Sequence, residues 1–244
     1  MRENKYNDKN FFDKYSQMER SIGGLESAGE WHILKNMLPD FNEKNVLDIG
    51  CGFGWHCRYA SSEGAKSVLG IDISSEMLKV AKNKTDDNKI EYRCMAMEDM
   101  NFSKGEFDIV ISSLALHYTK DFDEICKKVH GYLSSKGNFI FSVEHPIFTS
   151  NEKQDWCYGD EDEILNWPVD NYQYEGIRKT NFLGEDIIKY HRTIETYINT
   201  LIKNGFIINN ISEPVPPLIM VEENEFFKNE FRRPMFLMIA CSKS

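Results

Sequence analysis

The chain alternates between two patterns of apolar residues, and the order of these patterns predicts the fold class. Short runs rich in apolar residues are typical of strands that a sheet buries on both faces. Between them, apolar residues recur with helical spacing over 54–63, 75–84 and 121–133. The predicted strands are 45–50, 67–73, 90–95, 107–113, 138–144, 206–212 and 233–242. Strands that alternate with helices predict an α/β fold with a doubly wound, mostly parallel sheet of seven strands.

Two segments depart from this alternation. Residues 8–38 have helical spacing, so 1–40 is predicted to form helices that precede the first strand. Residues 146–185 have no dominant period, and their many aromatic side chains argue against a disordered linker. We expect 146–185 to fold over the strand ends as a cap on a substrate pocket, and 186–204 to form a helix. The whole chain, 1–244, is predicted to be a single domain.

A glycine-rich turn follows the first predicted strand, where residues 46–54 read VLDIGCGFG. Glycines at alternate positions let the backbone turn sharply and pass close to a ligand. The second strand ends at Asp72, and an acidic residue at that place accepts hydrogen bonds from ribose hydroxyls in nucleotide-binding α/β folds. These features predict a cofactor that contains adenosine. Trp55 breaks the G-x-G-x-x-G spacing that a dinucleotide would require.

The motifs together resemble those of class I S-adenosylmethionine-dependent methyltransferases, in their small-molecule, type 11-like branch. The resemblance covers roughly residues 41–145. Its motifs are D-x-G-x-G-x-G from Asp48, SSEML at 74–78, FDIV at 107–110, LALHY at 114–118 and LSSKGN at 133–138. The resemblance implies that the cofactor is S-adenosylmethionine and the product S-adenosylhomocysteine.

The resemblance also implies which residues contact the methionine part, the ribose and the adenine of the cofactor. The implied cofactor-binding residues are Gly50, Cys51, Gly52, Asp72, Ile73, Met97, Ser113 and Leu114. An alternative role for Asp72 is to cap the helix at 75–84. The N-terminal helices would cover the cofactor, as they often do in this family, or simply pack onto the sheet.

The position after the third strand departs from the family pattern. The family commonly has an acidic residue there that accepts a hydrogen bond from the adenine amino group, whereas this chain has Ala96. Glu98 or Asp99 would substitute for it, or the Met97 backbone and apolar contacts would hold adenine alone. His117 is interpreted either as a packing residue or as a contact to cofactor or substrate.

The composition of the chain limits the cellular compartment and the class of methyl acceptor that we expect. The net charge of −10 would repel nucleic acid on average, which favours a small-molecule acceptor. No apolar run approaches the ~18 residues of a membrane span, so no membrane association is expected. The six cysteines lack C-x-x-C spacing, which predicts free thiols and a cytoplasmic protein. No second Cys/His pair lies near His56 and Cys57 in the sequence, so no metal site is expected. The oligomeric state stays open.

Two histidines are the predicted catalytic residues. Methyl transfer from a sulfonium is an in-line attack, so alignment supplies much of the rate and a base helps only if the acceptor loses a proton. His145 follows the fifth strand directly, and Pro146 biases it toward an extended backbone. His191 would lie on the helix after the cap. We expect at least one of the two to lie within about one water-bridged hydrogen bond of the acceptor.

Two other classes of function stay open from the sequence. A protein or nucleic-acid methyltransferase would require a basic or peptide-binding surface. A non-catalytic S-adenosylmethionine-binding protein would lack a pocket for an acceptor.

Overall fold

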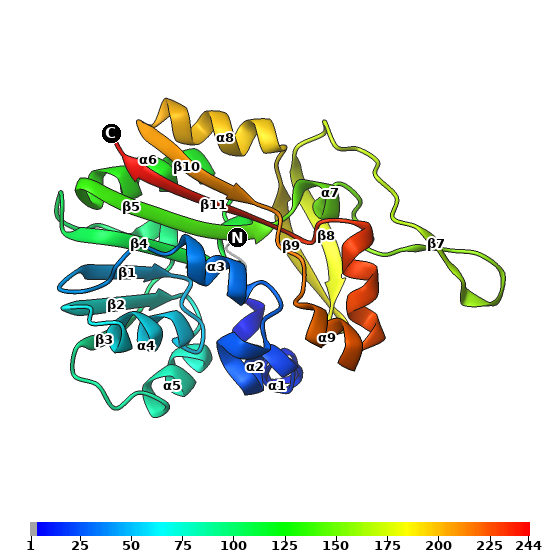
Figure 1. The fold of residues 1–244 in the computed structure, drawn as a ribbon, viewed down its shortest axis with the longest axis horizontal. Coiled ribbons are helices and arrows are strands. Elements are labelled where there is room, and N and C mark those ends of the chain that lie inside the picture. The colour runs from blue at the N-terminus through cyan, green and yellow to red at the C-terminus, as the bar shows by residue number, and fades with distance from the viewer. Residues whose placement is uncertain (1–3) are drawn as a thin grey trace.

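The structure is a computed structural model that describes residues 4–244, apart from the side chains of residues 225 and 226. Its central sheet consists of β1 (Asn45–Ile49), β2 (Ser67–Asp72), β3 (Ile90–Cys94), β4 (Phe107–Ser113), β5 (Leu133–Glu144), β10 (Phe206–Ser212) and β11 (Phe236–Lys243). The strand order is β10-β11-β5-β4-β1-β2-β3 (Figure 1). Only β11 in this sheet runs antiparallel to its neighbours. The doubly wound, mostly parallel sheet of seven strands predicted from the sequence is therefore confirmed.

Helices cover both faces of the sheet because successive strand residues point to opposite faces. Val46 and Val68 belong to the apolar cluster under α3, α4 and α5. Leu47 and Leu69 belong to the cluster under α6 and α8 on the other face. These helices are α3 (Trp31–Met37), α4 (Trp55–Ser62), α5 (Ser75–Asn83), α6 (Phe122–Tyr132) and α8 (Ile194–Lys203).

Two further parts of the chain lie beyond the end of the sheet where the parallel strands finish (Figure 1). In the N-terminal segment, residues 4–38, the part beyond the sheet contains α1 (Lys9–Ser16) and α2 (Glu19–Gly23), while α3 packs on the face of the sheet. The cap, residues 146–191, contains two small antiparallel sheets. Its elements are α7 (Pro146–Thr149), β6 (Cys157–Tyr158), β7 (Ile164–Asn166), β8 (Gly176–Phe182) and β9 (Glu185–His191), and α9 (Leu218–Glu223) follows later in the chain.

The helix predicted for 186–204 is wrong over its first part. Residues 185–191 form β9, which pairs with β8 as an antiparallel hairpin, and the helix α8 begins only at Ile194. Alternate residues of β9 are buried, and the Thr193 side chain caps the helix by accepting the N–H of Thr196. Buried residues therefore recur every second position, as pairing with β8 requires, and not with the spacing of a helix.

Arg178 on β8 holds the parts of the cap together. Its guanidinium donates hydrogen bonds to the carbonyl oxygens of Thr149, Asn171 and Tyr174 at 3.1, 3.2 and 2.7 Å. The side chain is buried, so the hydrogen bonds compensate a costly desolvation. Arg178 thus links α7 to the loop before β8 through hydrogen bonds. No helix within residues 4–244 is both long and apolar enough to cross a membrane.

We predict that Arg178→Met lowers the free energy of unfolding by about 2–3 kcal/mol, because several carbonyl oxygens of the cap lose a charged donor. Urea denaturation followed by circular dichroism measures this change. Lys179→Met is the matched control on the exposed side of the same strand, and should change stability by less than about 0.5 kcal/mol. Equal stability of the two variants would contradict this role of Arg178.

Candidate functional site

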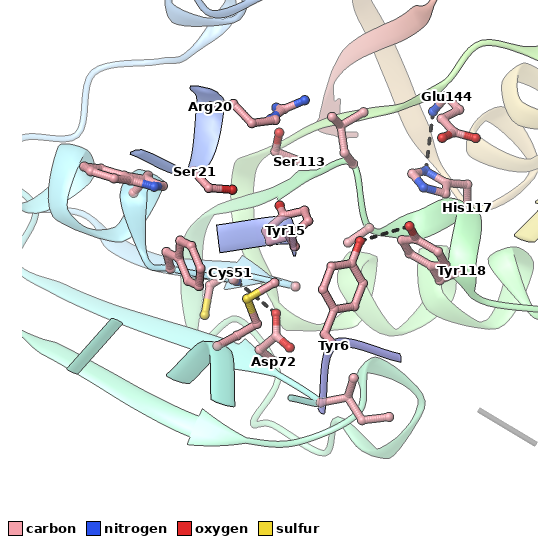
Figure 2. A pocket seen from close by; sticks show the side chains of 18 of the residues that line it. Tyr6, Tyr15, Arg20, Ser21, Cys51, Asp72, Ser113, His117, Tyr118 and Glu144 are labelled. Carbon is pink, nitrogen blue, oxygen red and sulfur yellow. Dashed lines mark hydrogen bonds between the residues drawn. The ribbon is translucent and has the colours of Figure 1, made fainter. Parts of the chain in front are cut away.

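A cavity of about 410 Å³ lies at the carboxyl ends of β1, β2 and β4. The strand order reverses between β1 and β4, and open α/β sheets bind ligands at such switch points. Side chains of the N-terminal segment, among them Tyr6, Tyr15 and Arg20, form part of its walls (Figure 2). Side chains of the cap, including Lys189, complete them. Every residue that the sequence predicted to bind a cofactor lines this cavity: Gly50, Cys51, Gly52, Asp72, Ile73, Met97, Ser113 and Leu114.

The glycine turn after β1 forms one wall. The N–H groups of Gly50 and Cys51 both donate to the carbonyl oxygen of Ile71, at 2.8 and 2.9 Å. Gly52 has a φ of +52°, and a Cβ built there meets no protein atom within 4 Å. A side chain at this position would therefore take space in the cavity and keep a ligand away from the backbone.

Asp72 is fixed by the backbone on both sides. Its Oδ2 accepts the N–H of Gly52 at 2.9 Å, and its Oδ1 accepts the N–H of Ser74 at 2.8 Å. The cap of helix α5 is Ser74, whose hydroxyl accepts the N–H of Met77, so Asp72 is not the capping residue. Burial raises the pKa of Asp72, and these hydrogen bonds oppose that shift. Each carboxylate oxygen keeps a lone pair for a hydroxyl donor of a ligand.

The wall after β3 is mainly apolar. Ile73, Ala96 and Met97 line it, together with Glu98. Of the two acidic residues that the sequence offered as substitutes at Ala96, Glu98 lines the cavity and Asp99 does not. A planar apolar group fits between such side chains, and Glu98 adds an acidic group to this wall.

The far end of the cavity holds a buried ion pair. Lys189 Nζ on β9 lies 2.5 Å from Glu144 Oε1 at the end of β5. Gln154 donates to the other carboxylate oxygen at 3.1 Å and accepts from Lys189 at 3.2 Å. Burial alone would raise the pKa of Glu144, but Lys189, His117 and Gln154 together hold it below its usual range. Glu144 is therefore an ionised acceptor of hydrogen bonds at neutral pH.

His117 lies beside this pair and is neutral near pH 7. Burial lowers its pKa from 6.5 to about 4. Its Nδ1 accepts the N–H of Glu144 at 3.4 Å (Figure 2), so its proton is on Nε2. His117 therefore presents a hydrogen-bond donor to the cavity and not a base. In the same view the hydroxyl oxygens of Tyr6 and Tyr118 lie 3.1 Å apart in the cavity wall.

Neither predicted catalytic histidine lines the cavity. His145 is fully buried: its Nδ1 accepts the N–H of Ile147 at the start of α7, and its Nε2 lies 2.8 Å from a carboxylate oxygen of Glu213. His191 ends β9, with its ring nitrogens 2.7 Å from Thr149 Oγ1 and 2.9 Å from the Tyr172 carbonyl oxygen. Both imidazoles are occupied by protein partners outside the cavity, so the structure gives no support to a place beside the acceptor, and their catalytic role stays a prediction.

Sequence reasoning missed the polar residues that the N-terminal segment and the cap bring to the cavity. These are Tyr6, Tyr15, Arg20, Gln154, Asn181 and Lys189. None belongs to a local motif, and only the folding of distant segments over the strand ends places them there. Among the side chains that the structure describes, in 4–224 and 227–244, no group of three or more His, Cys, Asp or Glu could hold a metal ion.

Comparison with known proteins decides the family. A profile described as "Methyltransferase domain" matches residues 47–141. A structure from Mesorhizobium loti, an S-adenosylmethionine-dependent methyltransferase, is 39% identical, with a TM-score of 0.84 over 90% of this chain and 100% of that chain. A Listeria monocytogenes structure assigned to the same enzymes is 54% identical, with a TM-score of 0.83 over 89% of this chain and 99% of that chain. The chain belongs to the S-adenosylmethionine-dependent methyltransferases.

A more distant relative has a named substrate. The malonyl-[acyl-carrier protein] O-methyltransferase of Priestia megaterium is 25% identical over 136 residues, which are 54% of this chain and 46% of that relative. This match covers about half of each protein.

The cavity fits the cofactor of this family. Asp72 offers oriented acceptors for two hydroxyl groups, Gly52 leaves room where a Cβ would intrude, and Ile73 and Met97 offer apolar surface. The volume of the cavity lies in the range of small-molecule and cofactor sites, about 300–1,000 Å³. The individual roles of these residues stay predictions.

We predict that Asp72→Asn weakens binding of S-adenosylhomocysteine roughly tenfold to a hundredfold, because the amide removes the charge and replaces one acceptor oxygen by a donor. Isothermal titration calorimetry measures the dissociation constant. Glu91→Gln, on an exposed position of β3 outside the cavity, is the control and should leave it unchanged. Unchanged binding by a correctly folded Asp72→Asn protein would remove Asp72 from the site.

Proposed function

We propose that the protein transfers the methyl group of S-adenosylmethionine to a small-molecule acceptor that is held between the strand ends and the cap. The observation that carries the proposal is the extent of the cavity: its lining includes Asp72 after β2 and also Lys189 of the cap. The cap hairpin and the N-terminal segment both contribute side chains to it. Space of about 410 Å³ for cofactor and acceptor together favours an acceptor of modest size.

The cofactor-binding wall has a positioning role in this proposal. Gly50, Gly52, Asp72 and Met97 would hold the cofactor, which supplies a methyl group on a positively charged sulfur when it is bound. The turn and Asp72 are fixed to each other by hydrogen bonds, so they orient a ligand without reorganising. The cap and the N-terminal segment would exclude water from the space beside this wall.

The far end of the cavity would orient the acceptor. Glu144 can accept a hydrogen bond from a hydroxyl or an amine, and His117 can donate one from Nε2. Lys189 keeps Glu144 ionised and in one position through its 2.5 Å contact. These groups would align the attacking lone pair of the acceptor, which is the main task in a transfer with a good leaving group.

A distant relative from Priestia megaterium is named for a malonyl group that is carried on a protein, and its similarity to this chain is confined to 136 residues. In this proposal the cap sets the acceptor, because Gln154, Asn181 and Lys189 of the cap line the cavity. The net charge of −10 supports an acceptor other than nucleic acid.

We predict that label from S-adenosylmethionine carrying a tritiated methyl group will enter the small-molecule fraction of a bacterial extract. The purified protein is incubated with the fraction below roughly 1 kDa and, separately, with protein and RNA fractions. Incorporation that depends on the protein and occurs in the small-molecule fraction supports the proposal. Incorporation confined to protein or RNA would contradict it.

We further predict that Glu144→Gln lowers methyl transfer to the labelled acceptor by roughly tenfold to a hundredfold, because a charged hydrogen-bond acceptor is lost. The dissociation constant of S-adenosylhomocysteine should stay within about twofold of the wild-type value. Glu195→Gln, on α8 and outside the cavity, is the control. Normal turnover by Glu144→Gln would show that Glu144 does not orient the acceptor.

A further inference from the structure

The cap contains a second cavity, separate from the one at the strand ends, which is the main cavity. The second cavity has a volume of about 350 Å³, within the range of small-molecule sites. Arg232 and Arg233, which precede β11, line it, whereas none of the acidic side chains that the structure describes does. Its other walls are largely apolar and include Ile147, Trp156, Trp167, Val169 and Pro234. None of these residues belongs to the cofactor-binding motifs.

Arg232 gives the second cavity a positive charge that no carboxylate of the protein neutralises. Its guanidinium donates hydrogen bonds to the carbonyl oxygens of Ile164 and Leu165 at 3.3 and 2.6 Å, and to the side-chain oxygen of Asn229 at 3.2 Å. These acceptors are neutral, and Arg232 has no ion-pair partner among the side chains of 4–224 and 227–244. The guanidinium also lies 4.9 Å from the centre of the Trp156 ring. Several contacts thus hold Arg232 in place while its charge remains for an anion.

Arg233 contributes a hydrogen-bond donor rather than a charge. Glu230 neutralises it, because the two carboxylate oxygens accept from both terminal nitrogens of Arg233 at 2.7 and 3.1 Å. The remaining donor, Nε, is buried and has no hydrogen-bond partner in the described part of the chain. A buried N–H without an acceptor is costly, so an oxygen atom of a ligand beside it would stabilise the site.

One layer of side chains separates the second cavity from the main cavity. Ile147 lines the second cavity and the next residue, Phe148, lines the main one. Pro234 and Met235 are divided between the two cavities in the same way. The ring of Phe148 stacks on that of Trp167, with the centroids 5.0 Å apart and the planes at 15°. A rotation of Phe148 away from Trp167 would therefore join the two cavities.

The main cavity leaves little room for an acceptor. Its volume of about 410 Å³ has to hold the cofactor, which consists of a nucleoside and an amino acid, in addition to the acceptor. That volume is near the lower end of the range for sites that hold a single small molecule. An acceptor with more than a small reacting group would therefore extend past Phe148, where the second cavity adjoins the main one.

The charges of the two cavities favour one orientation of such an acceptor. In the main cavity Lys189 is paired with Glu144, so this cation is not left for an anionic group of the acceptor. In the second cavity Arg232 has neutral partners alone, and its charge attracts an anion. An anionic group of the acceptor would thus lie in the second cavity, away from the methyl group.

We propose that the second cavity binds the distal end of the methyl acceptor, and that this end is an apolar body with an anionic group such as a carboxylate. The inference rests on the proposed function, because it requires methyl transfer to a small molecule in the main cavity. Trp156 and Val169 would contact the apolar body, and Arg232 would pair with the anion. The reacting end would pass Phe148 and lie beside Glu144.

The first test uses two probes of similar shape. 1-Naphthoate has an apolar body and a carboxylate, whereas 1-naphthamide has the same body without the charge. In calorimetry with saturating S-adenosylhomocysteine, wild-type protein should bind 1-naphthoate roughly fivefold to tenfold more tightly, a modest preference because Arg232 is exposed to solvent. Arg232→Gln should remove this preference, and Arg232→Lys should retain part of it because it keeps the charge.

Arg93→Gln is the matched control for the loss of one positive charge. Arg93 lies on an exposed position of β3, outside both cavities, where it pairs with Glu91. This variant should bind both probes as the wild-type protein does.

The second test uses the acceptor in the small-molecule fraction of the extract. The tritiated product should bind to an anion-exchange resin at pH 7, because methylation leaves the distal anion in place. Arg232→Gln should raise the KM for the acceptor, measured as the amount of this fraction, by roughly fivefold to tenfold. The kcat and the dissociation constant of S-adenosylhomocysteine should stay within about twofold of the wild-type values.

The outcomes separate this inference from the function on which it rests. A preference for 1-naphthoate that Arg232→Gln removes, together with an anionic product, supports the proposal. Equal or undetectable binding of the two probes, or a labelled small molecule that the resin does not retain, would overturn it and leave the proposed function intact. Label confined to protein or RNA would refute the proposed function, and the inference with it.

Discussion

The site depends on one constraint: the Asp72 carboxylate is bonded to the backbone of two different loops. It accepts the N–H of Gly52 from the turn after β1 and the N–H of Ser74 from the start of α5. The carbonyl oxygen of Ile71, one residue earlier, accepts two N–H groups of the same turn. These hydrogen bonds fix the ends of β1 and β2, the glycine turn and the start of α5 to each other. Together these elements form the cofactor-binding wall, and the other walls of the cavity are built around it.

Those other walls are joined to each other as well as to the sheet. Lys14 of α1 donates to the Leu183 carbonyl oxygen in the turn between β8 and β9 at 2.8 Å, and Lys5 lies 3.4 Å from Glu185. Asn7, between these two lysines in the sequence, accepts a hydrogen bond from the Ser74 hydroxyl at the start of α5. The N-terminal segment thus bridges the cofactor-binding wall and the cap hairpin.

The parts that the sequence predicted are those whose signals are local. The glycine turn, Asp72 and the strand pattern depend on neighbours close in sequence, and the structure places them as expected. The cap could not be predicted because its order comes from tertiary pairing: Lys189 meets Glu144 only when β9 pairs with β8. His191 seemed to lie on a helix for the same reason, and Arg20 reaches the cavity only because α2 folds over the strand ends.

A crystal structure with S-adenosylhomocysteine would show the direction in which the cofactor lies in the cavity. We expect both ribose hydroxyls within hydrogen-bond distance of Asp72 and the sulfur facing the enclosed space that leads to Glu144 and Lys189. A sulfur that faces bulk solvent, or a ribose bound away from Asp72, would refute this placement of the site.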